Sequence, residues 1–232
     1  GARRPGAAVN ARRDPVVVMA DTLAQGVAWC EAPLGVTPGP GGQHPLFGTH
    51  NRLLAIGTPR YPGAYLELIA IDPGAAGADE ARRTRWFDMD DAALRERVRR
   101  HGPQLIHWVA RVPDVAQSCA ALARLGIDRG EILQASRLTP RGLLQWQIAV
   151  RADGRRLFDG TLPTLIQWGA VHPADSLPAS GVSLQVLRLG HPDAATLTHA
   201  LARLGLGDVA TTASAEPSLH AELLTPRGPV RI

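Results

Sequence analysis

Three side chains that can move protons or bind metal ions stand in segments with the pattern of β-strands: Glu67, His107 and Gln167. Glu67 lies inside the apolar run 65–71, where burying a carboxylate without a partner is costly, so we predict a functional role for it. His107 shares its strand face with Arg111, and a core histidine with satisfied hydrogen bonds is the alternative. Gln167 is neutral, and its side chain could equally bond the backbone.

The glycine-rich string GGQHPLFGTHN at 41–51 is the most distinctive local feature of the chain. It does not lead from a strand into a helix, as a dinucleotide-binding fingerprint must. We therefore predict a loop and strand entry at the mouth of a pocket, where His44, Thr49 and Asn51 contact a ligand. Ordinary hairpin chemistry, in which Gly, Pro and Asn supply the turn, is the alternative.

The elements that must position these residues repeat three times along the chain. Each copy opens with a strand, a turn, a helix and a glycine stop, over 15–36, 107–128 and 182–208. Asp21 or Thr22 and Asp114 are the expected helix N-caps, and Gly35, Gly126 and Gly205 the expected stops. Short alternating runs follow as three strands per copy, at 36–42, 50–57 and 64–71, then 130–138, 143–151 and 162–171, then 208–214, 218–224 and 228–232. Each copy is thus a βαβββ unit.

These units divide the whole chain. We expect a flexible tail over 1–13, a first βαβββ module over 14–74, a helical connector over 75–103, a second module over 104–175 and a third βαβββ-like unit over 176–232. A third unit in a fold built from pairs would shield one edge of the sheet or pair with a second chain. A homodimer is therefore expected.

Composition and charge exclude several classes of protein. With 232 residues, 45% hydrophobic and 20% charged, the chain can bury a sizeable core, which excludes a disordered chain. The net charge of +4 comes entirely from the tail, at Arg3, Arg4, Arg12 and Arg13. The balanced remainder argues against a nucleic-acid partner. No apolar run is long enough to cross a membrane, so we expect no membrane partner and a cytoplasmic protein. Cys30 and Cys119 are expected to be reduced packing residues.

Paired βαβββ units resemble the vicinal oxygen chelate superfamily, which includes glyoxalase I, extradiol dioxygenases and bleomycin-resistance proteins. The strings PGGQHPLFGTHN, YLELIAIDP, HPADSLPASGV and RLGHP look like a bacterial glyoxalase-like branch of it. The resemblance covers residues 14–232. It implies an α+β fold of the glyoxalase/bleomycin-resistance type, in which paired modules form a cup and the third unit follows at the C-terminus.

The resemblance also implies a divalent metal, because this superfamily holds one on the first and last strands of each module. Aligning the copies places Pro15, Glu67, His107 and Gln167 at those positions. Glu67, His107 and Gln167 would then bind Zn, Ni, Mn, Fe or Mg. Pro15 stands where a histidine is expected and has no donor atom, so an absent metal is the alternative.

Two functions follow from the resemblance. The first is a metal-dependent lyase or isomerase acting on a small molecule with vicinal oxygens. Glu67 would serve as ligand and catalytic base, while His44, Thr49, Asn51 and Arg111 would contact the substrate. The second is a metal-free protein that binds a small-molecule ligand for resistance or sequestration.

Overall fold

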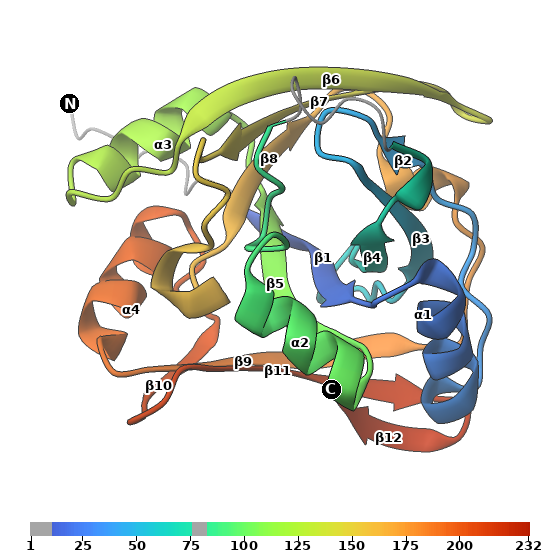
Figure 1. Cartoon of the computed structure of the whole chain (residues 1–232). Coiled ribbons are helices and arrows are strands. Elements are labelled where there is room, and N and C mark those ends of the chain that lie inside the picture. The colour runs from blue at the N-terminus through green and yellow to red at the C-terminus, as the bar shows by residue number, and fades with distance from the viewer. Residues whose placement is uncertain (1–10, 76–82) are drawn as a thin grey trace.

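The computed structural model describes residues 11–75 and 83–232. Its strands form an eight-stranded sheet, in the order β2-β3-β4-β1-β5-β8-β7-β6, and a four-stranded sheet, in the order β10-β9-β11-β12. Figure 1 shows the larger sheet curled, with β6 arching over the top of the molecule toward β2. The predicted α+β fold is confirmed.

The first module runs from β1 to β4. Its elements are β1 (Arg12–Met19), α1 (Leu23–Trp29), a π-helical turn (Cys30–Leu34), β2 (Gln43–His44), β3 (Thr49–Ala55) and β4 (Tyr65–Ile71). The strand predicted at 36–42 is absent from this described segment, where only Gly39 forms an isolated bridge, to Leu53. The tail was predicted to reach residue 13, but β1 already begins at Arg12; residues 1–10 lie outside the described chain.

The second module repeats this order. After the connector helix α2 (Ala92–His101) come β5 (Gln104–Arg111), α3 (Val115–Ala123), β6 (Glu131–Thr139), β7 (Gly142–Val150) and β8 (Thr164–Trp168). In both modules the last strand pairs in parallel with the first, β4 with β1 and β8 with β5. The two first strands pair antiparallel, which joins the modules into one sheet.

Local sequence signals set the helix ends as predicted. Thr22 and Asp114 cap the N-termini of α1 and α3 by accepting a hydrogen bond from a backbone N–H three residues on. The glycine stops at 35, 126 and 205 have φ of 73°, 76° and 78°, a left-handed conformation that glycine adopts without a side-chain clash.

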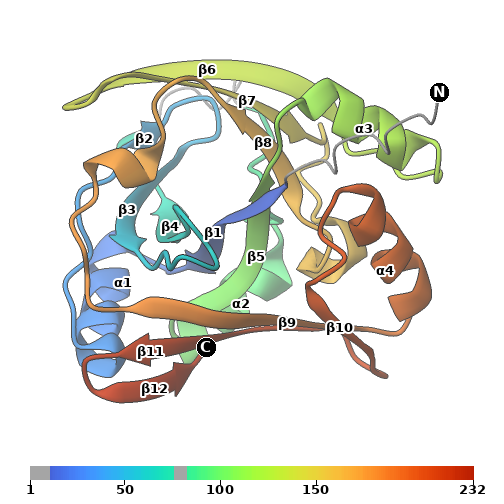
Figure 2. The same ribbon diagram turned by 180° about the vertical axis from the view of Figure 1, so that it is seen from behind.

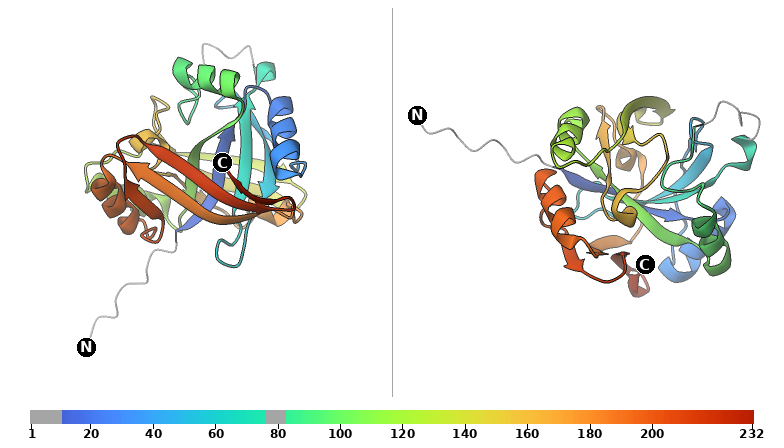
Figure 3. Two further views of the ribbon diagram at one scale, coloured as in Figure 1. Left: turned by 90° about the horizontal axis from the view of Figure 1, so that it is seen from below. Right: turned by 60° about the vertical axis from the view of Figure 1, so that its left-hand side comes forward.

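The third unit comprises β9 (Ser183–His191), α4 (Ala194–Arg203), β10 (Ala210–Ala213), β11 (Ser218–Thr225) and β12 (Gly228–Arg231). It keeps the βαβββ order along the chain but pairs differently, because β9 lies between β10 and β11. Figures 2 and 3 show its sheet crossing the outside of the larger one. It does not shield a sheet edge as predicted; its apolar side chains join those of α1, α3, β1 and β5 in one core.

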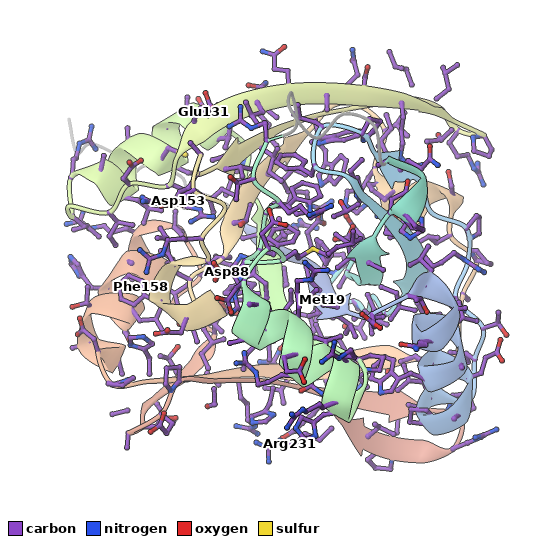
Figure 4. The ribbon with its side chains drawn as sticks, viewed as in Figure 1. Met19, Asp88, Glu131, Asp153, Phe158 and Arg231 are labelled. Atoms are coloured by element: carbon purple, nitrogen blue, oxygen red, sulfur yellow. The ribbon has the colours of Figure 1, made fainter. Side chains whose placement is uncertain are left out.

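A second core fills the inside of the cup. Residues just before α2 enter it: Trp86, Phe87 and Met89 are buried there against β1, β5, β7 and β8. Phe87 and Asp88 both have left-handed backbones, with φ of 57° and 58°. Asp88, labelled in Figure 4, accepts a hydrogen bond from Arg156 Nε at 2.9 Å, which fixes this turn beside the second module.

Two properties expected from composition can be checked directly. Among the described residues, no helix combines the length and apolar character needed to span a bilayer. Cys30 and Cys119 are free thiols, Cys30 is buried, and burial raises its pKa to about 11. Cys30 is therefore the reduced packing residue that its apolar surroundings predict.

Candidate active site

A small cavity lies within the cup, between the two modules. Its volume is about 50 Å³. The polar side chains that line it are His44, Asn51, Tyr65, Glu67 and Arg137, and its aromatic walls include Trp86, Phe87, Trp146 and Trp168. Because one water occupies ~10–15 Å³ by this measure, the cavity admits only about three to five groups of that size. It can therefore hold a small molecule or the reacting end of a larger one.

Glu67 projects from β4 into this cavity and is 7% exposed. Its Oε2 accepts a hydrogen bond from Asn51 Nδ2 at 2.5 Å. Burial raises the pKa of Glu67 to about 7, although the Asn51 hydrogen bond acts in the opposite direction. A carboxyl group with this pKa can both accept and return a proton near neutral pH.

Asn51 is held in one orientation by the glycine-rich loop. Gly42 N donates to Asn51 Oδ1 at 2.8 Å, so the amide nitrogen faces Glu67 and His44 Nε2, which is 3.2 Å away. His44 Nδ1 then donates to Thr49 Oγ1 at 3.0 Å. Burial lowers the pKa of His44 to about 3, so the imidazole is neutral and its 3.8 Å approach to Glu67 is not an ion pair.

Two of the three glycines of this loop, Gly41 and Gly42, make close approaches. A Cβ at Gly41 would lie 2.1 Å from the backbone oxygen of Asn51. At Gly42 a Cβ would lie 3.0 Å from Arg137 Nη1, so the guanidinium rests against the glycine backbone. The structure thus brings the predicted residues His44 and Asn51 to the cavity, while Thr49 is fully buried behind His44. Their contacts with a substrate stay predictions.

Arg137 is the charged site residue that sequence reasoning missed. It pairs with Leu144 across the β6–β7 hairpin, and both side chains line the cavity. Within the described chain its half-buried guanidinium has no hydrogen bond or ion pair. Strand alternation places Arg137 on the face of Ala135, but nothing in the sequence shows that this hairpin reaches across to the loop of the first module.

A hydrogen-bonded group around Asp14 ties the start of the first module to the end of the second. Asp14 is 1% exposed and accepts hydrogen bonds from Trp168 Nε1 and, at 2.7 Å, from His172 Nε2. It thereby fixes Trp168 as a wall of the cavity. Arg111, predicted to contact substrate, donates to Pro62 O at 3.1 Å, and its Nε lies 3.8 Å from Asp14 Oδ1. It is not among the residues that line the cavity.

The predicted metal ligands His107 and Gln167 are engaged elsewhere. His107 is fully buried, with Nδ1 2.8 Å from Gly160 O and Nε2 2.9 Å from Thr164 Oγ1. Burial lowers its pKa well below the usual value, so the imidazole is neutral. Gln167 Oε1 accepts a hydrogen bond from Val115 N at 2.9 Å, at the start of α3. Both side chains are therefore hydrogen-bonded within the fold, which is the arrangement expected of a structural residue.

Strand register explains why Gln167 lies apart from Glu67. When the modules are matched on their first strands, Val17 corresponds to Val109. Val17 pairs with Glu67, whereas Val109 pairs with Thr164. Thr164 thus occupies the place of Glu67 in the second module, and Gln167, three residues later, points to the opposite sheet face. The alignment that matched Gln167 with Glu67 superimposes Pro73 and Pro173, the prolines after the last strands, and it is therefore displaced by three residues.

The described residues do not fit the four-position metal set. Pro15 lines the cavity without a donor atom, and in 11–75 and 83–232 no group of three or more His, Cys, Asp or Glu side chains could hold a metal ion. We therefore derive no step through a metal. Metal binding by Glu67, His107 and Gln167 stays a prediction.

A protein-family model described as a glyoxalase-like domain matches residues 14–205. The chain belongs to this glyoxalase-like family. Its place in the vicinal oxygen chelate superfamily, which the repeated modules predicted, is confirmed. A search of the curated proteins found no match to the chain.

Solved structures share the fold of this glyoxalase-like chain at low sequence identity. A hypothetical protein from Staphylococcus aureus matches with a TM-score of 0.56 and 16% identity, over 96% of this chain and 85% of that one. Methylmalonyl-CoA epimerase of Streptomyces coelicolor matches with 0.40 and 17%, over 69% and 96%. The epimerase of Mycobacterium tuberculosis gives 0.38 and 16%, over 72% and 91%. The first likeness shows the fold alone, and the two epimerase scores carry no argument about function.

Proposed function

We propose that this glyoxalase-like protein is an isomerase or lyase that removes a proton from a carbon next to a carbonyl group in a small molecule with vicinal oxygens. The observation that supports this most directly is Glu67, a buried carboxyl group at the cavity with a pKa of about 7. A base with this pKa near the working pH combines a large ionised fraction with enough basicity to take a proton from carbon.

The proposed step uses groups of this chain alone. The C–H bond beside the carbonyl breaks, its electron pair moves toward the carbonyl oxygen to form an enolate, and the proton passes to Glu67. In a 2-hydroxycarbonyl substrate, return of that proton to the former carbonyl carbon isomerises the substrate as the hydroxyl proton moves to the former carbonyl oxygen. Return of the proton to the same carbon inverts that carbon or exchanges its hydrogen. Arg137 adds a positive charge to the cavity, which favours the enolate.

The surrounding residues hold the Glu67 carboxylate in place and limit the number of water molecules beside it. Asn51 donates to Glu67 and is itself oriented by Gly42, so the carboxylate has one defined position. Trp86, one of the aromatic residues that line the cavity, stacks on Phe87 with ring centroids 4.7 Å apart, and this narrows the space beside Glu67. A restricted and preorganised site strengthens each electrostatic contact made with the substrate.

Hydrogen exchange into candidate substrates tests this function. The purified chain is incubated in D₂O with 2-oxoaldehydes and 2-hydroxyketones, and loss of the C–H signal beside the carbonyl is followed by NMR. We expect enzyme-dependent exchange that Glu67→Gln reduces by about 10²–10⁴-fold, the usual contribution of a general base. Glu216→Gln, an exposed position, is the matched control.

The same experiment separates the alternatives. Exchange that continues unchanged in Glu67→Gln would exclude Glu67 as the base. Binding of a substrate without any exchange would favour the metal-free binding protein. Repeating the assay after chelation, and after addition of Zn, Ni, Mn, Fe or Mg, tests the metal dependence predicted from the resemblance.

A further inference from the structure

Arg137 gives the cavity a positive charge, and no described side chain forms a hydrogen bond or an ion pair with it. It is the one cationic side chain among the described residues that line this space. The acidic side chain of the cavity wall, Glu67, accepts a hydrogen bond from Asn51, and it forms neither a hydrogen bond nor an ion pair with Arg137.

The placement of Arg137 is specific. Its guanidinium rests on Gly42, where a Cβ would come within 3.0 Å of Nη1. Gly42 also donates to Asn51, which in turn donates to Glu67. Gly42 therefore orients the base through Asn51 and lies beside the cation, so the base and the cation line one cavity.

The size of the cavity limits what Arg137 can bind there. About 50 Å³ accommodates only a few non-hydrogen atoms, and a single cation matches a single negative charge. A planar guanidinium pairs best with a planar oxyanion through two parallel hydrogen bonds, which a carboxylate provides. A dianionic phosphate group would leave one charge without a partner.

We propose that the substrate is a short oxo acid whose carboxylate binds Arg137 while the carbon on the other side of its carbonyl group presents a C–H bond to Glu67. This inference rests on the proposed function and names the substrate class for the same site.

Pyruvate and its neutral analogue pyruvamide test the proposal, because they differ only in the carboxylate. Binding is followed by the fluorescence of the tryptophans that line the cavity, and exchange of the methyl hydrogens by NMR in D₂O. We expect the natural chain to bind pyruvate at least tenfold more tightly than pyruvamide and to show a correspondingly lower KM. Equal binding of the two, or no binding of pyruvate at 10 mM, would overturn the proposal.

Variants locate the effect at Arg137. Arg137→Met should raise the Kd and KM for pyruvate at least tenfold and leave those for pyruvamide unchanged, and Arg137→Lys should restore part of the difference. Arg141→Met, at the exposed tip of the same hairpin, is the matched control. Equal losses for both probes in Arg137→Met would show a structural role and overturn the assignment.

Failure of this inference is distinguishable from failure of the proposed function. Glu67→Gln should lose exchange but keep the preference for pyruvate in the fluorescence titration. Loss of the preference with retained exchange contradicts only carboxylate recognition. Retained preference with exchange that does not depend on Glu67 contradicts only the proposed base.

Discussion

The charge of Glu67 is costly to the folded chain, and this cost can be measured. Its pKa rises from 4.5 in the unfolded chain to about 7 in the folded one, because of burial. Between these pH values the unfolded chain has lost the proton and the folded chain has kept it, so stability falls as the pH rises through this window. The loss from this one group amounts to ~3 kcal/mol.

Glu67→Gln should remove this loss. We expect the variant to exceed the natural chain in free energy of unfolding by ~1 kcal/mol at pH 5 and by ~3 kcal/mol at pH 8, since the amide does not ionise. Urea unfolding at the two pH values measures the difference, with Glu216→Gln as the exposed control. A difference that is equal at pH 5 and pH 8 would contradict an elevated pKa.

The sequence predicts some residues of this site and not others, for physical reasons. The role of Glu67 is predictable because a carboxylate in an apolar run must be buried. The closeness of His44 and Asn51 is predictable because one short loop carries both. Arg137 is not, because its place depends on how far the β6–β7 hairpin curls over the cup. Gln167 was placed by an alignment that the strand register shifts by three residues.

At the scale of elements, the glycine-rich loop at 41–51 lies between Glu67, which it orients through Asn51, and Arg137. Gly41→Ala tests it, because the added Cβ would lie 2.1 Å from the backbone oxygen of Asn51 and backbone must move. We expect a loss of about 1–3 kcal/mol in stability, as for other overpacked positions. Hydrogen exchange at the substrate should fall too, because Asn51 no longer orients Glu67.

Gly207→Ala is the matched control for the loop. Its nearest contact for an added Cβ, in α4, is an ordinary 3.7 Å, so neither stability nor exchange should fall. Thermal unfolding and NMR exchange measure both variants. If Gly41→Ala retained full stability and exchange, the loop would not be what holds Asn51 in place.

The elements themselves follow from local signals more fully than their contacts do. The caps at Thr22 and Asp114 and the glycine stops define helices from a few neighbouring residues. The turn at Phe87 and Asp88 does not follow, because its left-handed backbone is stabilised by distant partners such as Arg156. The connector was predicted only as helical, and no local pattern indicates that Trp86, Phe87 and Met89 enter the cup.

At the scale of the whole molecule, repetition predicts the fold but not how the third copy is used. Three similar units share an order of elements, yet the third pairs β9 between β10 and β11 and covers the outer face of the other two. Pairing order depends on which apolar faces remain open, and a single unit's sequence does not contain that information. The homodimer and the cytoplasmic location stay predictions.

Because the third unit shares the outer core with both modules, we expect the three units to fold together. Leu184 on β9 is 1% exposed, and its N–H donates to Ile56 O of the first module at 2.8 Å. Leu184→Asp would bury a charge without a partner, so we expect a loss of at least about 3 kcal/mol. Leu224→Asp, at a leucine that is 46% exposed, should cost far less.

Tryptophan fluorescence shows whether that loss reaches the cup. Of the five tryptophans, those at 29, 108, 146 and 168 belong to the two modules, Trp86 belongs to the connector, and none belongs to the third unit. If the three units fold together, Leu184→Asp should shift the thermal midpoint of the fluorescence and that of calorimetry downward by the same amount, in one transition. A fluorescence midpoint that stayed in place while a separate calorimetric transition moved would mean that the cup folds without its third unit.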